Sequence, residues 1–226
     1  TAAGAARGGR AMLPILPGVV AFGLLYGFLA GQRGLSGLEV ALMSAFVFAG
    51  ASQFVALELW QQPLPVLALV AAVLIVNLRH LLMGPVLLPW LGALPPAKAY
   101  ASLYFMTDES WGMSVAEMRQ GGSDAAFLPG AGLTLWLFWV GSSVGGRLIG
   151  DVSALVERWG LDYLTTAFFV ALLAGFWRGR GDLAPWLVAA LAAVLAREIL
   201  PGTWYILAGA LAGSLVGAAA DVRRAR

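Results

Sequence analysis

The chain has 226 residues, of which 60% are hydrophobic and 12% charged, with a mean hydropathy of +0.83 and a net charge of +2. This composition excludes a soluble domain and is typical of a polytopic helical membrane protein embedded in a lipid bilayer. The small net charge does not suggest nucleic acid as a partner. Zero cysteines exclude disulfides and thiolate metal sites, and one histidine cannot make a histidine cluster. No nucleophile and base pair is recognisable, so we expect no enzymatic activity, metal or cofactor.

We predict a single all-α transmembrane domain over residues 1–226, with seven or eight transmembrane segments, some of them broken. Residues 1–11 are expected to form a polar tail and residues 221–226 a basic one. The first span runs from about Met12 to Gly31. Its Pro17-Gly18 pair should weaken the hydrogen-bond ladder near one end, and its glycines favour close packing against another helix.

The second span, from about Glu39 to Trp60, has small residues and Gln53 near its middle. Small residues allow close helix approach, and an amide can donate and accept hydrogen bonds across an interface. This pattern fits a packing seam. It equally fits a functional site, because Gln53 is expected at the same depth as Asn77 in the third span.

The third span, from about Pro65 to Leu91, has Asn77-Leu78-Arg79-His80 at its centre. An arginine at this depth costs about 2.5 to 3.5 kcal/mol on insertion scales, so it indicates a functional site. Pro85 removes a backbone donor and should break the helix just after His80. Secondary transporters use such discontinuous helices to bind substrates and ions. The alternative is that Arg79 only pairs with an acid and joins two helices.

That acid is available in the fourth span, from about Ala99 to Met118, whose middle is Thr107-Asp108-Glu109-Ser110. We expect Arg79 to neutralise one of the two carboxylates. The other would be desolvated, with a raised pKa, and would titrate during transport together with His80. The residues alone do not decide which acid pairs with Arg79.

The remaining spans are expected at about Phe127–Ile149 and Leu161–Trp177, followed by a long region, Ala184–Ala220, which Arg197-Glu198 and Pro201-Gly202 divide in two. Gly37-Leu38-Glu39 is echoed by Gly160-Leu161-Asp162, and Pro17-Gly18 by Pro129-Gly130. These weak matches are compatible with an inverted repeat of spans one to three and five to seven. Outside the central tetrad, Lys and Arg divide eight against five between the two sides, which favours cytoplasmic termini.

These elements, in this order and spacing, resemble the AzlC-type branched-chain amino acid exporter family over nearly the whole chain. The matching elements are Pro17-Gly18, Phe22-Gly23, the run Phe48-Ala49-Gly50-Ala51-Ser52-Gln53-Phe54, Asn77-Leu78-Arg79-His80, Thr107-Asp108-Glu109 and Gly160-Leu161-Asp162. The resemblance implies the large subunit of an exporter in the bacterial inner membrane, with leucine, isoleucine and valine among its substrates. It also implies a small AzlD-type membrane partner. The sequence has no Walker-type phosphate loop, so we expect secondary transport, coupled to protons or another ion.

An apolar zwitterion needs a positive group for its carboxylate, an acceptor for its ammonium and an apolar pocket for its side chain. We expect Arg79 or a half-helix N-terminus to supply the first, Asp108 or Glu109 the second, and Phe22, Phe48 and Phe54 the third. Gln53, Asn77 and His80 complete the expected site. One alternative is a channel for a small anion or neutral solute, with Arg79 and His80 at its constriction. Another is an assembly subunit whose partner holds the transport site, and a homo-oligomer is compatible with either reading.

Overall fold

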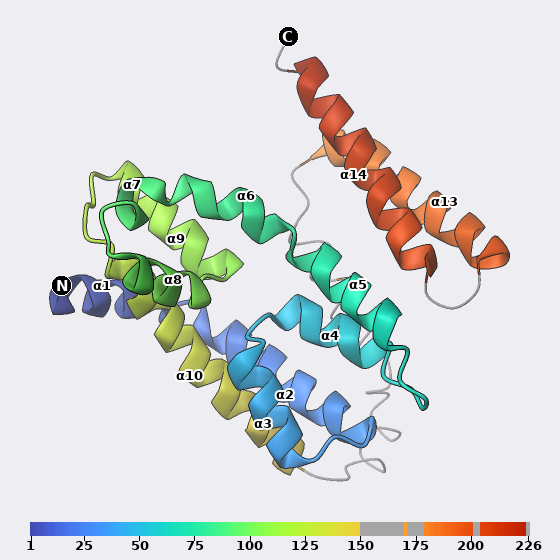
Figure 1. Cartoon of the computed structure of the whole chain (residues 1–226), viewed down its shortest axis with the longest axis horizontal. Helices are drawn as coiled ribbons and strands as arrows, with labels where there is room; N and C mark the ends of the chain where they lie inside the picture. Colours follow the sequence, from blue (N-terminus) through green and yellow to red (C-terminus); the bar gives the residue numbers. More distant parts are fainter. Residues whose placement is uncertain (150–169, 171–178, 201–203, 225–226) are drawn as a thin grey trace. The chain divides into compact units, whose positions relative to one another are not determined.

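The computed structural model describes residues 1–149, 170, 179–200 and 204–224, and every regular element in these ranges is a helix (Figure 1). The all-α prediction is therefore confirmed. The chain divides into two compact units, residues 1–65 with 73–150, and residues 66–72 with 151–226. The expected sixth span, residues 161–177, and the 160–162 half of the expected repeat lie outside the described residues.

The first eleven residues are not a polar tail. They form helix α1, Ala2–Met12, which meets helix α2, Leu16–Gln32, at an angle of 72°. Pro17 lies in the first turn of α2, where its missing N–H removes no helical hydrogen bond. The expected weakening therefore falls at a helix start rather than inside a span.

Helix α2 packs closely against helix α10, Phe127–Leu148, which confirms the expected fifth span. A Cβ added to Gly27 would lie 1.8 Å from the backbone oxygen of Ser143, so only glycine permits this approach. The residue numbers of the contact positions increase together along both helical segments, from Gly8 beside Phe127 to Gly31 beside Arg147. The α1–α2 segment and α10 therefore run in parallel, and the predicted packing role of the glycines is confirmed.

The expected second span folds back on itself instead of crossing as one helix. It consists of α3, Gly37–Phe46, and α4, Gly50–Glu58, with Phe48 at a φ of 44° in the turn between them. A continuous helix would separate Arg33 from Glu58 by nearly 40 Å, yet their side chains lie 4.0 Å apart. The two helices therefore form a V-shaped pair, called V1 below, whose open end lies beside the end of α2.

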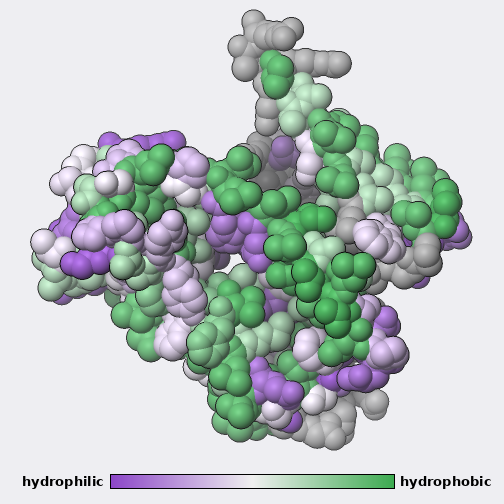
Figure 2. Space-filling model, viewed as in Figure 1, coloured by the Kyte–Doolittle hydropathy of each residue, from purple (hydrophilic) through white to green (hydrophobic). Residues whose placement is uncertain are grey.

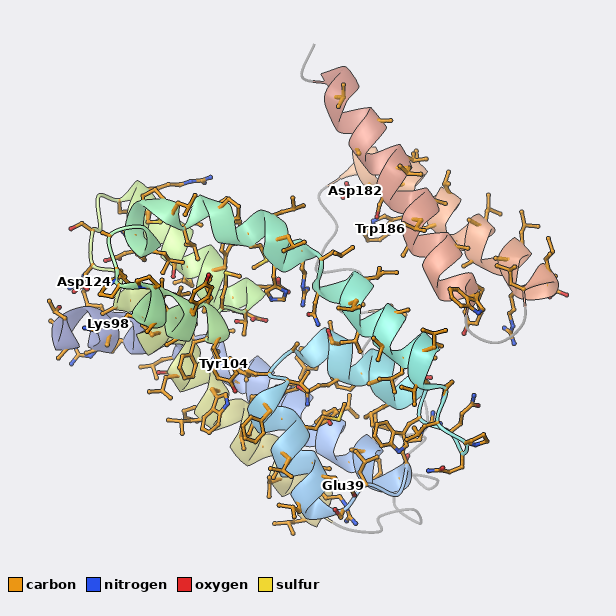
Figure 3. All side chains as sticks on the ribbon, viewed as in Figure 1. Glu39, Lys98, Tyr104, Asp124, Asp182 and Trp186 are labelled. Carbon is orange, nitrogen blue, oxygen red and sulfur yellow. The ribbon has the colours of Figure 1, made fainter. Side chains whose placement is uncertain are left out.

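The expected fourth span folds back in the same way. It consists of α8, Pro96–Tyr104, and α9, Asp108–Arg119, called V2 below. Lys98, at the start of α8, and Asp124, five residues after α9, line one pocket, and Figure 3 shows both at the same end of the pair. The Trp90 indole, on the short helix α7, Leu88–Leu91, donates to the carbonyl of Gly122 at 3.0 Å. The open end of V2 therefore lies at the start of α10, opposite to that of V1.

The third span is interrupted at one residue, Leu78, but Leu78 keeps helical backbone angles and Val66–Val86 still forms one helix of membrane-spanning length. The span consists of helix α5, Val66–Asn77, and helix α6, Arg79–Val86. The single residue Leu78 separates them. We predicted the break after His80 because of Pro85, and this was wrong. Pro85 is the last residue but one of α6, where the helix is about to end, so its missing N–H does not interrupt a continuing ladder.

The described part of the second unit consists mainly of two antiparallel helices. The 3₁₀ turn Arg180–Asp182 leads into α13, Leu183–Ile199, and α14, Trp204–Arg224, follows, so the expected division of the last apolar region is confirmed. Gly209 faces Ala193, and Gly213 faces Ala189. Residues 221–224 continue α14, so the basic end is not a separate tail.

Apolar side chains cover the outer surface of many of these helices, as expected in lipid. Along α5 and α6, Leu67, Val70, Leu74, Leu78 and Leu81 are all exposed, and Figure 2 shows apolar residues over much of the visible surface. Among the described residues, Val66–Val86 and Phe127–Leu148 are long and apolar enough to cross a membrane, and α1 with α2 adds a third span if the bent pair counts as one.

Candidate functional site

Three helix breaks come together in the first unit, near the middle of α10. The first lies at the tip of V1, residues 47–49, the second at Leu78, and the third at the tip of V2, residues 105–107. A polar link joins each pair of breaks. Since broken helices leave backbone groups without helical partners, a membrane tolerates them only inside protein or beside a water-filled cavity.

The tips of V1 and V2 are linked through the carbonyl of Ala45. Because α3 ends at Phe46, this carbonyl has no helical N–H four residues further on. The Tyr104 hydroxyl, at the end of α8, donates to it, and so does the indole of Trp136 in the middle of α10, at 2.9 Å. Figure 3 shows Tyr104 between α8 and α3. Both lone pairs of the freed carbonyl therefore have a donor.

The tip of V1 is linked to the break in the third span through Ser52. Its hydroxyl donates to the side-chain oxygen of Asn77 at 3.0 Å. Ser52 lies in the first turn of α4, and Asn77 is the last residue of α5. The ring of His80 stays local, with Nδ1 3.1 Å from the Asn77 carbonyl. Asn77 and His80 therefore both lie at the site, where their observed hydrogen bonds are made next to Leu78.

The break in the third span is linked to V2 by an ion pair. Arg79 Nη1 lies 2.5 Å from Asp108 Oδ2, with both side chains about one third exposed, at 31% and 39%. This identifies Asp108 as the acid that pairs with Arg79, and it leaves Glu109 exposed. The Nε atom of Arg79 is buried and has no hydrogen-bond partner. The guanidinium therefore keeps one donor that the chain does not use.

The acids stand at a helix start, not in the middle of a helix. Thr107 caps α9 through a reciprocal capping box with Ser110, and Asp108 and Glu109 form the first turn. Carboxylates are favoured there because the helix dipole is positive at its N-terminus. The cap therefore fixes the start of α9, and with it the position from which Asp108 reaches Arg79 on α6.

Gln53 lies in the interior of the protein, among α3, α4 and α10. It is fully buried, accepts from the Trp139 indole at 3.0 Å and donates to Ser44 at 3.3 Å. Both ends of its amide are thus used to join α4 to α10 and to α3. This supports the packing interpretation of Gln53.

The three expected phenylalanines lie on different segments, Phe22 on α2, Phe48 at the tip of V1 and Phe54 on α4. Phe54 packs edge-on against Tyr26, whereas Phe48 lies against Tyr104 with ring centroids 6.4 Å apart. Phe22 is partly exposed on α2. The ring contact with Tyr104 places Phe48 at the tips of V1 and V2. Tyr104, Trp136 and Ala45 were not among the site residues expected from the sequence.

An open pocket of about 780 Å³ leads from the outside toward the tip of V2. It lies between α7, α8 and the start of α10, and Phe105 in its lining belongs to the third break. None of the nine expected site residues lines it. Its walls are mainly apolar, with Lys98 and Asp124 among them. It therefore extends from the open end of V2 to Phe105 at the tip of V2.

Two opposed V-shaped pairs that meet at a broken span are a transporter-like arrangement. A family model described as AzlC protein matches residues 14–152, which include all three breaks. The chain belongs to the AzlC family. The match confirms the family resemblance drawn from the sequence, and it identifies the chain as a membrane protein of a transport family.

Named relatives agree with this assignment. An uncharacterized membrane protein of Archaeoglobus fulgidus is 31% identical over 90% of this chain and 89% of its own. The branched-chain amino acid transport protein AzlC of Bacillus subtilis is 29% identical over 73% of this chain and 65% of its own. The inner membrane protein YgaZ of Escherichia coli is 29% identical over 92% and 87%. No solved structure matches the chain.

Proposed function

We propose that the chain is a secondary transporter that exports branched-chain and similar apolar amino acids across the bacterial inner membrane. The observation that carries this proposal is the Arg79–Asp108 ion pair at the meeting point of three helix breaks. It offers opposite charges for a zwitterion in a region otherwise built from apolar helices. The name of the Bacillus subtilis relative supports the substrate class.

Within this proposal, Arg79 binds the substrate carboxylate through the Nε–H that has no partner in the chain. Asp108 or Glu109 accepts the ammonium group, and Phe48 contacts the apolar side chain. An apolar pocket separates leucine from valine by only about 1 to 3 kcal/mol per methylene, so a group of similar substrates is expected. Gln53 supports the site by holding α4 in place.

Counterflow in liposomes tests the transporter against the channel alternative. Preloaded leucine should accelerate uptake of radiolabelled leucine by the purified chain, whereas a channel would show no acceleration. Two analogues sharpen the test, because 4-methylpentanoate has only the carboxylate and 3-methylbutylamine only the ammonium. Neither should drive counterflow if both charges are bound. Activity of the chain alone would exclude an assembly role.

We further propose ion coupling, with Glu109, Asp108 and His80 as the candidate coupling groups. The exposed carboxylate of Glu109 is next to the paired Asp108 and takes part in none of the four ion pairs among the described residues. Leucine transport by Glu109→Gln and Asp108→Asn should therefore respond differently to pH from the wild type. An unchanged pH profile in both variants would exclude these acids as the coupling groups.

The membrane arrangement we propose has seven or eight embedded segments, of which V1 and V2 enter and leave on the same side. Both termini are cytoplasmic, and a small AzlD-type membrane protein is the partner implied by the family resemblance. An inverted repeat that includes residues 150–178 is compatible with this plan. Co-purification of a small apolar chain with this one would support the partner.

A further inference from the structure

The carbonyl of Ala45 has two donors that come from different parts of the first unit. Tyr104 belongs to the tip of V2, whereas Trp136 belongs to the long helix α10. α10 also packs along α2 through glycine contacts, so Trp136 sits on a fixed element. Tyr104 is 41% exposed and ends a nine-residue helix beside the break.

Loss of the Tyr104 hydrogen bond and loss of the Trp136 hydrogen bond have different consequences for the Ala45 carbonyl. If Tyr104 moves away, Ala45 keeps the Trp136 hydrogen bond, so its partly buried carbonyl still has a donor. If Trp136 were absent, departure of Tyr104 would leave the carbonyl unpaired, which is unfavourable away from water. The contact between the tips can therefore open at low cost only because the second donor remains.

We propose that Tyr104 is a positioning residue that holds the tips of V1 and V2 together, and that this link opens and closes during transport. The inference rests on the proposed function for its role in the cycle. It assigns Trp136 the opposite part, because Trp136 stabilises the tip of V1 when the link is open. Phe48, whose ring lies beside Tyr104, moves with the tip of V1.

Spin-label distances between the two tips test this directly. The chain has no cysteine, so Leu42→Cys on α3 and Ala101→Cys on α8, both exposed, can be labelled without background. We expect Tyr104→Phe to raise the ratio of separated to joined tips by about threefold to tenfold, as loss of one hydrogen bond implies. Trp136→Phe should lower that ratio. Tyr100→Phe, an exposed tyrosine on the same helix, is the matched control and should change nothing.

The opposite effects of Tyr104→Phe and Trp136→Phe on the ratio of separated to joined tips distinguish a switching link from structural support. A purely structural role would make both variants separate the tips, and that result would overturn the proposal, as would an unchanged distribution in Tyr104→Phe. Leucine counterflow on the same proteins is read separately. A wild-type chain that moves no leucine would contradict the proposed function, whereas the label distances would still decide the role of Tyr104.

Discussion

Arg79 and Asp108 are each the first residue of a helix, and their side chains form a 2.5 Å ion pair across two helix breaks. The helix dipole favours a carboxylate at the capped start of α9, whereas Arg79 is a cation within the apolar run Val66–Val86. Asp108 therefore stabilises its own helix and also offsets the unfavourable position of Arg79.

Asp108→Asn should destabilise the protein more than Arg79→Gln, because it leaves the arginine without a counter-charge, whereas an unpaired Asp108 is still favoured by the start of α9. We expect a cost of about 1 to 2 kcal/mol, below the 3 to 5 kcal/mol of a fully buried pair, since both side chains are partly exposed. Thermal unfolding in detergent measures it. The double variant should recover part of the loss, and equal, additive losses would show that the two groups do not interact.

Gly27→Ala should strongly destabilise the contact between α2 and α10. The added Cβ would lie 1.8 Å from the backbone oxygen of Ser143, so one helix has to shift. Overpacking of this kind costs about 1 to 3 kcal/mol or more. Gly18→Ala on the same helix is the control, because a Cβ there meets nothing within 4 Å. Similar melting temperatures for the two variants would contradict the close packing.

Thr107→Ala should destabilise α9 and weaken transport together. Loss of an N-cap costs about 0.5 to 2 kcal/mol, and here it also frees the turn that aims Asp108 at Arg79. Thr107→Ser keeps the capping oxygen and should behave like the wild type. Melting temperature and leucine counterflow measure the two effects. A normal counterflow rate in a destabilised Thr107→Ala variant would show that the helix cap is not needed for transport.

Cysteine accessibility should distinguish V-shaped pairs from crossing helices. Ala97→Cys and Ser123→Cys flank V2 and should react with an impermeant maleimide from the same side of the membrane. Leu38→Cys and Gln61→Cys flank V1 and should both react from the other side. All four positions are exposed. Labelling of Ala97→Cys and Ser123→Cys from opposite sides would show that the fourth span crosses.

Some parts of this arrangement were predictable from the sequence. The glycines of the first span indicated close packing, and Gly23 and Gly27 do lie against α10. Thr107-Asp108-Glu109-Ser110 was interpreted as the polar middle of a span, yet a hydroxyl followed by two acids is also a helix-start signal. The same residues fit both patterns. Hydropathy is averaged over many residues and does not detect a short turn, whereas the capping residues mark the position of the turn.

Other parts depend on contacts that no local pattern contains. Pro85 indicated a break, but its effect depends on where α6 ends. Tyr104 and Trp136 find the carbonyl of Ala45 only because V1, V2 and α10 meet at one point. Aromatic residues are frequent throughout this chain, so their positions alone did not single out these two.

In the proposed membrane arrangement, the fold-back of V1 and V2 changes the side of the membrane that the residues between the two tips face. Two crossings disappear, so every segment after V2 keeps its expected side, and only the stretch between the two tips is reversed. Lys98 then joins the N-terminal side, and the division of Lys and Arg outside the central tetrad rises from eight against five to nine against four. The folded-back helices thus give the chain a stronger positive-inside bias than uninterrupted spans would.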